Sequence, residues 1–254
     1  MLLLHANPGD HRDFGPVLPA LGQRFAVAAV DWPGYGESTV TDPAAVTMLG
    51  LADVAATVWD ALAGAGYRDP VVVGNSVGGY AAVRLAQRRS MAGVVLVQPA
   101  GFVPLNAVTR AVCRTMGRPG VARRAITPAA RLYLGAPRGA DLRAVYERAK
   151  AVPGRPDRLQ VYCSLWRGLV DPSADLTTGA PLLPGTPVQV VWGRYDPVNP
   201  WLLNRAGLRR QLPHAEVAVL AARHESFCEN PALFLRTVTP FLDRCAAEGT
   251  AAAG

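Results

Sequence analysis

Three residues whose types suit nucleophilic catalysis each lie directly after an apolar, strand-like segment. Ser76 stands in G-N-S-V-G at 74–78, Asp196 in W-G-R-Y-D-P at 192–197, and His224 a few residues after the last apolar segment. A serine hydroxyl is a poor nucleophile until a base takes its proton, and a carboxylate can orient that base. We therefore predict Ser76 as a nucleophile, His224 as its base and Asp196 as the orienting acid.

The spacing of the glycines around Ser76 has a steric reason. A nucleophile on a tight strand-to-helix turn leaves room only for small residues two positions before and two positions after it. The same turn would aim the backbone N–H of Val77, at the start of a helix, towards developing negative charge. The competing interpretation is a glycine-rich turn whose serine only caps a helix. The apolar segment before the motif and the helical segment after it favour the nucleophile.

The other histidines fit the role of base less well. His5 and His11 lie in the first loop, and His214 lies in the surface-like turn Q-L-P-H-A-E. Only His224 follows a late strand, and the order serine, aspartate, histidine is the one that α/β-hydrolases have along the chain.

Short apolar segments alternate with helical ones along most of the chain. This alternation predicts an α/β fold with a mostly parallel sheet buried on both faces. Residues 101–181 break the rhythm, because they are helical and lack a clear strand. We expect this insertion to sit over the carboxyl edge of the sheet. The predicted strands are 2–4, 25–30, 71–73, 92–97, 188–191 and 216–220, and the predicted core helices are 14–21, 51–63, 80–88 and 231–244.

Composition excludes several classes of protein. The chain has 254 residues, half of them hydrophobic, which suits one large globular domain with an insertion. No apolar run approaches the roughly 18 residues of a membrane span, and no signal-peptide pattern opens the chain, so a cytoplasmic location is expected. The four cysteines are scattered without metal-like spacing and are expected to be reduced thiols.

The net charge of +7 belongs to one stretch of the chain. Residues 101–181 hold 13 basic and five acidic residues, whereas the rest is almost neutral. The arginines are irregularly spaced with few aromatic residues between them, so a solvated helical face is the main interpretation and no nucleic-acid or membrane partner is expected. The alternative is a surface that selects anionic substrates.

Four motifs in order resemble those of the α/β-hydrolase superfamily. L-L-H-A-N-P-G-D at 3–10 resembles its oxyanion loop, and D-W-P-G-Y-G-E-S at 31–38 resembles its second loop. G-N-S-V-G-G is similar to the nucleophile elbow of capped esterases and carbon–carbon-bond hydrolases. W-G-R-Y-D-P and R-H-E-S-F-C-E-N-P are similar to the acid and histidine loops. The match covers nearly the whole chain.

The resemblance implies an α/β-hydrolase core at 1–100 and 182–246, a helical cap at 101–181 and a flexible tail at 247–254. It also implies Asn7 as the second oxyanion N–H beside Val77. Ala6 stands where the family usually has glycine, so a positive φ there would strain the loop. The chain begins at what would be the third strand of the family's sheet. Either the true start lies upstream, or 25–30 is an apolar edge that invites pairing into a homodimer.

Three functions remain open at this point. The first is hydrolysis of a small carboxylic ester or related acyl compound through an acyl-enzyme, without metal or organic cofactor. The second is cleavage of a carbon–carbon bond in an anionic diketone gripped by cap arginines. The third is a non-catalytic small-molecule binding protein on the same fold. For the ester hydrolase, Tyr133, Tyr162 and Trp166 are candidates for the pocket wall, and packing of the cap against the core is the alternative role of these aromatics.

Overall fold

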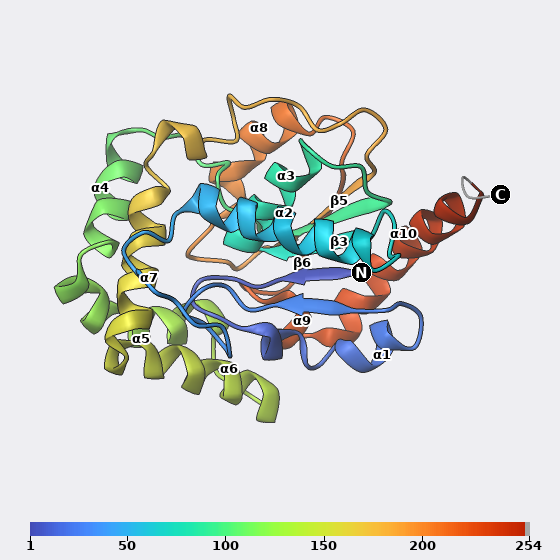
Figure 1. The fold of residues 1–254 in the computed structure, drawn as a ribbon. Coiled ribbons are helices and arrows are strands. Elements are labelled where there is room, and N and C mark those ends of the chain that lie inside the picture. The colour runs from blue at the N-terminus through green and yellow to red at the C-terminus, as the bar shows by residue number, and fades with distance from the viewer. Residues whose placement is uncertain (252–254) are drawn as a thin grey trace.

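The computed structural model describes the backbone of residues 1–251 and the side chains of residues 1–247. Its centre is a six-stranded sheet in the order β2-β1-β3-β4-β5-β6, with every neighbouring pair parallel. Figure 1 shows the sheet running through the middle of the molecule with helices on both faces. The strands are β1 (Leu2–Leu4), β2 (Ala28–Val30), β3 (Val71–Asn75), β4 (Gly93–Val97), β5 (Val188–Gly193) and β6 (Glu216–Leu220).

Alternate residues of the strands pack into two separate hydrophobic cores, one on each face of the sheet. Leu2 and Leu4 join the core on one face of the sheet, whereas Leu3 between them joins the other. This is the period-2 alternation of a strand that is buried on both sides. On the first face pack α2 (Met48–Gly64), α3 (Val77–Ala86) and α8 (Trp201–Gln211). On the second pack α1 (Leu18–Gly22), α9 (Ser226–Glu229) and α10 (Pro231–Ala251).

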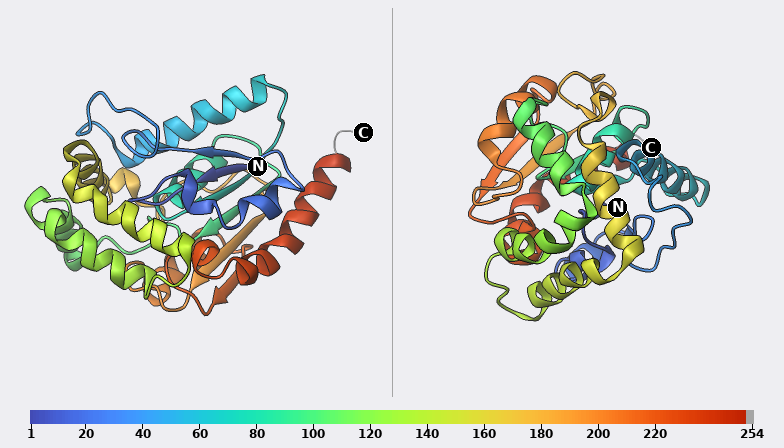
Figure 2. Two further views of the ribbon diagram at one scale, coloured as in Figure 1. Left: turned by 90° about the horizontal axis from the view of Figure 1, so that it is seen from below. Right: turned by 90° about the vertical axis from the view of Figure 1, so that its left-hand side faces the viewer.

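Residues 101–181 form helices and, within the described chain, no strand, as predicted. The helices α4 (Ala107–Met116), α5 (Pro119–Leu134), α6 (Ala140–Ala151) and α7 (Pro156–Gly168) gather at one end of the sheet. The left view of Figure 2 shows these green and yellow helices at the end of the molecule away from the C-terminus, and the right view looks onto that end. The strands run towards this end, so their carboxyl ends lie beneath the helices.

Several boundaries differ from the sequence prediction. A helix at 14–21 is wrong: η1 (His11–Phe14) is a 3-10 turn, and α1 begins only at Leu18. Pro19 explains the break, because it has no N–H to donate to the carbonyl of Gly15 and so must lie in the first turn of a helix. The strand predicted at 25–30 is shortened to Ala28–Val30. Helix α3 begins three residues earlier than predicted, directly after Ser76.

The C-terminal helix is longer than the predicted 231–244 and runs to Ala251. Of the predicted tail at 247–254, residues 252–254 lie outside the described residues. Strand β2 is at the edge of the sheet, as predicted for this segment. Pairing of that edge with a second chain stays a prediction. No helix in the described part of the chain is both long and apolar enough to cross a membrane.

Candidate active site

Ser76 lies on a strained turn between β3 and α3. Its backbone has φ 55° and ψ −114°, a conformation that residues with a side chain rarely adopt. The neighbouring strand holds the turn in place, because the Ser76 N–H donates to the Val97 carbonyl at 3.0 Å. This hydrogen bond helps to offset the strain, and the turn keeps the serine side chain at the carboxyl end of the sheet.

The two glycines of the motif are required by close backbone approaches. A Cβ at Gly74 would lie 2.3 Å from the carbonyl oxygen of Gly78, and one at Gly78 would lie 2.2 Å from that of Leu4. Both distances are far below van der Waals contact, so the steric reason given for the G-x-S-x-G spacing holds in the folded chain.

Asp196 and His224 are brought together from two different loops. The carboxylate oxygen Oδ2 of Asp196 lies 2.6 Å from Nδ1 of His224, and both residues are buried. The other oxygen of Asp196 accepts the backbone N–H groups of Val198 at 2.9 Å and Asn199 at 3.0 Å. A carboxylate held in this way assigns the hydrogen of the imidazole to Nδ1, which leaves the lone pair of Nε2 for another partner.

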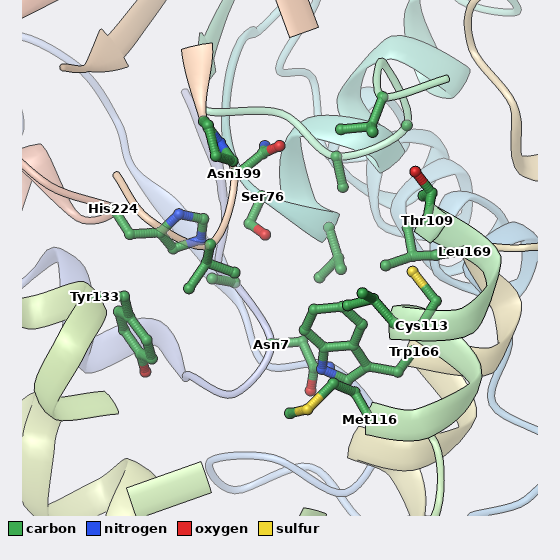
Figure 3. A pocket seen from close by; sticks show the side chains of 18 of the residues that line it. Asn7, Ser76, Thr109, Cys113, Met116, Tyr133, Trp166, Leu169, Asn199 and His224 are labelled. Carbon is green, nitrogen blue, oxygen red and sulfur yellow. The ribbon is translucent and has the colours of Figure 1, made fainter. Parts of the chain in front are cut away.

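Ser76 and His224 line the same cavity, which has a volume of about 410 Å³. Figure 3 shows the two side chains beside each other, with Tyr133 on the far side of His224. Among the described side chains, the Ser76 hydroxyl makes no hydrogen bond in this structure. Catalytic hydrogen bonds of empty sites often tighten only once substrate is bound. The structure therefore brings the three predicted residues to one site with Nδ1 of His224 already engaged.

Three buried amides hold this site together, and sequence reasoning missed their roles. Asn75 donates through Nδ2 to the carbonyls of Val97 at 3.0 Å and His224 at 3.2 Å. Asn199 donates to the carbonyls of Gln98 and Pro99, both at 3.0 Å. Gln98 has a positive φ of 43° and donates to the carbonyl of Arg223.

The amides tether the acid and histidine loops to the ends of β3 and β4. Asn75 lies inside the G-N-S-V-G motif, so its position next to Ser76 could be found from the sequence. For Gln98 and Asn199, the sequence offers only one indication of a role at the site, which is that each amide follows a strand.

The loop after β1 carries the predicted oxyanion residue Asn7. Its side chain is tied on both sides: Oδ1 accepts the Tyr35 hydroxyl at 2.7 Å, and Nδ2 donates to the Tyr162 carbonyl at 3.5 Å. Asn7 and Val77 both line the cavity with Ser76. Within the described chain, neither backbone N–H has a hydrogen-bond partner. Two N–H groups are therefore available at the cavity wall.

His5 and Ala6 support this loop. Nε2 of His5 accepts the Trp32 N–H at 3.0 Å, and the His5 carbonyl accepts the Trp32 indole N–H at 2.8 Å. Burial lowers the pKa of His5 to about 4, which keeps its ring neutral. The expected strain at Ala6 is wrong, because the non-glycine residues of positive φ in the described chain are Asp69, Ser76 and Gln98. Alanine is thus compatible with the loop conformation.

The three predicted pocket aromatics all line the cavity. Tyr133 packs edge-on against the His224 ring, with centroids 5.6 Å apart, and Tyr162 lies beside Trp166 at 6.2 Å. Burial raises the pKa of Tyr133, so its hydroxyl stays protonated. Most of the remaining wall is aliphatic, and much of it comes from the loop after β4, from α4 and from the loop before α8.

None of the described residues that line the cavity is an arginine or a lysine. Several arginines of 101–181 instead donate to backbone carbonyls, whereas Arg148 and Arg155 pair with carboxylates. Arg110 binds the Val170 carbonyl at 3.0 Å, Arg123 that of Pro153 at 3.1 Å, and Arg167 that of Gly117 at 2.6 Å. The basic charge of this segment therefore stabilises loops and helix ends and does not face the site.

One group of residues away from the cavity has metal-like geometry. The ligand atoms of Asp10, His11 and Asp31 lie within 4.8 Å of one another. They are already engaged in the protein, since Asp31 accepts His11 Nδ1 at 2.9 Å and Arg12 pairs with Asp10. We assign no ligand to this group.

The sequence and the fold now agree on a family. The model of the alpha/beta hydrolase family matches residues 1–237, and the chain belongs to that family. No curated protein matches the chain in sequence.

Solved structures share the fold at low identity. An enol-lactonase from Burkholderia xenovorans has a TM-score of 0.75 at 24% identity, covering 95% of this chain and 90% of its own. A thermophilic esterase from Thermogutta terrifontis has 0.73 at 24%, covering 96% and 89%. A putative epoxide hydrolase from Pseudomonas aeruginosa has 0.73 at 22%, covering 97% and 89%. One fold thus serves several hydrolytic activities, and substrate has to be argued from the site.

Proposed function

We propose that this protein is a serine hydrolase that cleaves an uncharged carboxylic ester, open-chain or cyclic, through an acyl-enzyme. The observation that carries the proposal is the 2.6 Å contact between Asp196 and His224 next to a serine at φ 55° in the same cavity. A helix-capping serine needs neither the strained turn nor a buried histidine beside it. A binding protein likewise has no need of this combination.

Each residue has one role in the proposed reaction. The Ser76 oxygen attacks the carbonyl carbon and gives its proton to Nε2 of His224, while Asp196 stabilises the imidazolium. The N–H groups of Asn7 and Val77 hold the oxyanion. The intermediate collapses, the C–O bond breaks, and His224 protonates the departing oxygen. A water molecule, deprotonated by His224, then hydrolyses the acyl-serine and regenerates the hydroxyl.

The cavity wall favours an uncharged substrate. A carboxylate buried among aliphatic and aromatic side chains would need a paired cation. The described lining offers none, so cleavage of an anionic diketone has no observation in its favour. The names of two structural neighbours, an esterase and an enol-lactonase, agree with ester chemistry. An epoxide hydrolase activity is disfavoured because residue 76 is serine, whereas those enzymes resemble this fold but use aspartate at the elbow.

We also propose that residues 101–181 act as the cap of this site. They supply Tyr133, Tyr162 and Trp166 to the cavity and lie over the carboxyl ends of the strands. The cap then excludes water from the acyl group and supplies the apolar wall.

Replacement of the nucleophile tests the proposal. Ser76→Ala is expected to lower kcat on p-nitrophenyl butyrate by at least about 1,000-fold, because it removes the attacking group. Ser226→Ala is the control for the substitution itself: Ser226 is also a serine, it is buried, and its hydroxyl has no hydrogen-bond partner in the described chain. It should retain activity. Unchanged hydrolysis by Ser76→Ala would contradict the proposed mechanism.

A further inference from the structure

Four of the aliphatic side chains that line the cavity are also exposed to solvent. We call Val108, Val112, Val198 and Leu203 the aliphatic rim. Their exposed fractions are 72%, 51%, 39% and 56%, and all four also line the cavity that holds Ser76. Exposed aliphatic surface costs free energy unless something covers it, and a cluster of it at an opening marks a binding surface.

The rim is built from two segments far apart in the sequence. Val108 and Val112 are four residues apart on α4, so they form one stripe of that helix. Leu203 lies in the first turn of α8, and Val198 lies in the loop just before it. One cavity contacts both segments, so the rim continues its wall out to the surface.

The position of His224 decides which part of the substrate meets this wall. The protonated His224 must give its proton to the leaving oxygen, so the alcohol side of the ester has to face His224. Figure 3 shows Ser76 between His224 and Tyr133 on one side and Cys113, Trp166 and Leu169 on the other. The acyl side of the substrate therefore points towards α4 and α7.

The wall on the α4 side suits a hydrocarbon chain. Met116, Trp166 and Leu169 line it, and burial raises the pKa of the Cys113 thiol, which stays neutral. Because this wall ends in exposed aliphatic side chains and not in a closed end, it sets no sharp upper limit on chain length.

We propose that a linear acyl chain of the substrate runs along α4 and leaves the cavity over the aliphatic rim. The inference rests on the proposed function and adds the substrate class, which is esters of long, unbranched fatty acids. Covering one methylene completely corresponds to about fourfold in kcat/KM (about 0.8 kcal/mol). On the half-open rim we expect roughly twofold for each methylene.

The test compares p-nitrophenyl butyrate with p-nitrophenyl laurate, both kept below the concentration at which laurate forms micelles. Leu203→Asp and, separately, Val112→Asp place a charge on the rim. Each is expected to lower kcat/KM on laurate by about tenfold or more and to change butyrate by less than about twofold. Leu132→Asp is the matched control: Leu132 is also 56% exposed, but it does not line the cavity. It should leave both substrates unaffected.

The outcomes separate the two proposals. Hydrolysis of butyrate that survives Ser76→Ala overturns the proposed function itself. If butyrate hydrolysis depends on Ser76, two results would overturn only the proposed chain exit over the rim. One is that kcat/KM on laurate is unchanged in both rim variants, and the other is that kcat/KM falls equally on both substrates. The laurate assay is repeated above the concentration at which micelles form. A loss that occurs only there would assign the rim to a lipid surface and overturn its role as a chain exit. Circular dichroism of each variant checks that the fold is retained.

Discussion

The side chain next to Ser76 connects the turn at Ser76 to the loop that carries His224. Asn75 is completely buried, and its two donated hydrogen bonds end on β4 and on the His224 carbonyl. The imidazole is thereby fixed from its backbone by Asn75 and from its ring by Asp196. Positions of catalytic groups matter steeply, since a misplacement of about 1 Å can cost about 100-fold in rate.

Asn75→Ala is therefore expected to lower kcat by roughly 10- to 100-fold with little change in KM. The reason is that His224 loses one of the hydrogen bonds that fix its position, whereas the apolar wall of the cavity is untouched. Steady-state kinetics on p-nitrophenyl butyrate measure this. In a Ser76→Ala background the same change should have no further effect, because the two residues serve one step. Additive losses would assign Asn75 a purely structural role.

Among individual residues, the sequence predicts those site residues that a local pattern marks. The strained turn at Ser76 is encoded by its own glycines, and its partners Asp196 and His224 are marked by strand ends in the order typical of the family. The amides are different, because Asn75 and His224 are 149 residues apart and Asn199 and Gln98 are 101 apart. Hydrogen bonds across such separations depend on the tertiary fold and leave no local pattern.

At the scale of elements, one partly buried arginine attaches α6 to the core. Arg148 donates to Asp13 of η1 at 2.6 Å and lies 3.5 Å from Asp10. Burial raises the pKa of Asp13 to about 6, and it raises that of the neighbouring Glu225 well above its usual value. Two buried carboxyl groups thus depend on one guanidinium, next to the loop that carries His224.

Arg148→Ala is expected to lower the free energy of unfolding by about 3 kcal/mol at pH 7.5, because it leaves an unpaired buried carboxylate. The loss should be smaller at pH 5, since Asp13 is protonated in the folded state below about pH 6. Urea denaturation at the two pH values measures this. Lys150→Ala on the same helix removes only the exposed pair with Glu147 and should have no measurable effect. Equal losses for the two variants would contradict the buried role of Arg148.

The elements themselves were predictable to different degrees. Strand β6 has the predicted bounds, and the core strands β3, β4 and β5 were found to within a few residues, because continuous β-branched segments are distinctive. The helix predicted at 14–21 was placed wrongly. Its apolar spacing is helical, but Pro19 decides where a helix can begin. The arginines of 101–181 could be counted from the sequence. Their backbone acceptors could not, because those carbonyls belong to loop conformations that only the folded chain defines.

At the scale of the whole molecule, stability towards acid is coupled to the oxyanion loop through His5. Its pKa is lowered by burial to about 4, against 6.5 for an exposed histidine. Between these values the unfolded chain binds a proton that the folded protein does not. The contribution of His5 is therefore present above about pH 6.5 and is lost as the pH falls towards 4, by about 3 kcal/mol.

His5→Gln should remove this dependence, because the glutamine oxygen can accept the Trp32 N–H but does not titrate. We expect the free energy of unfolding of the original protein, relative to the variant, to fall by about 3 kcal/mol between pH 7 and pH 4. Chemical denaturation across this range gives the difference. A constant difference would mean that folding does not lower the pKa of His5.

The central claim is that Ser76 is activated by His224 and Asp196. Intact-mass and peptide mass spectrometry after reaction with a fluorophosphonate probe test it most directly, since an unactivated serine does not react with the probe. The predicted result is one adduct on Ser76, absent in Ser76→Ala and formed far more slowly when His224 is replaced by glutamine. Failure of Ser76 to react, or labelling that is unaffected by the loss of His224, would contradict the claim.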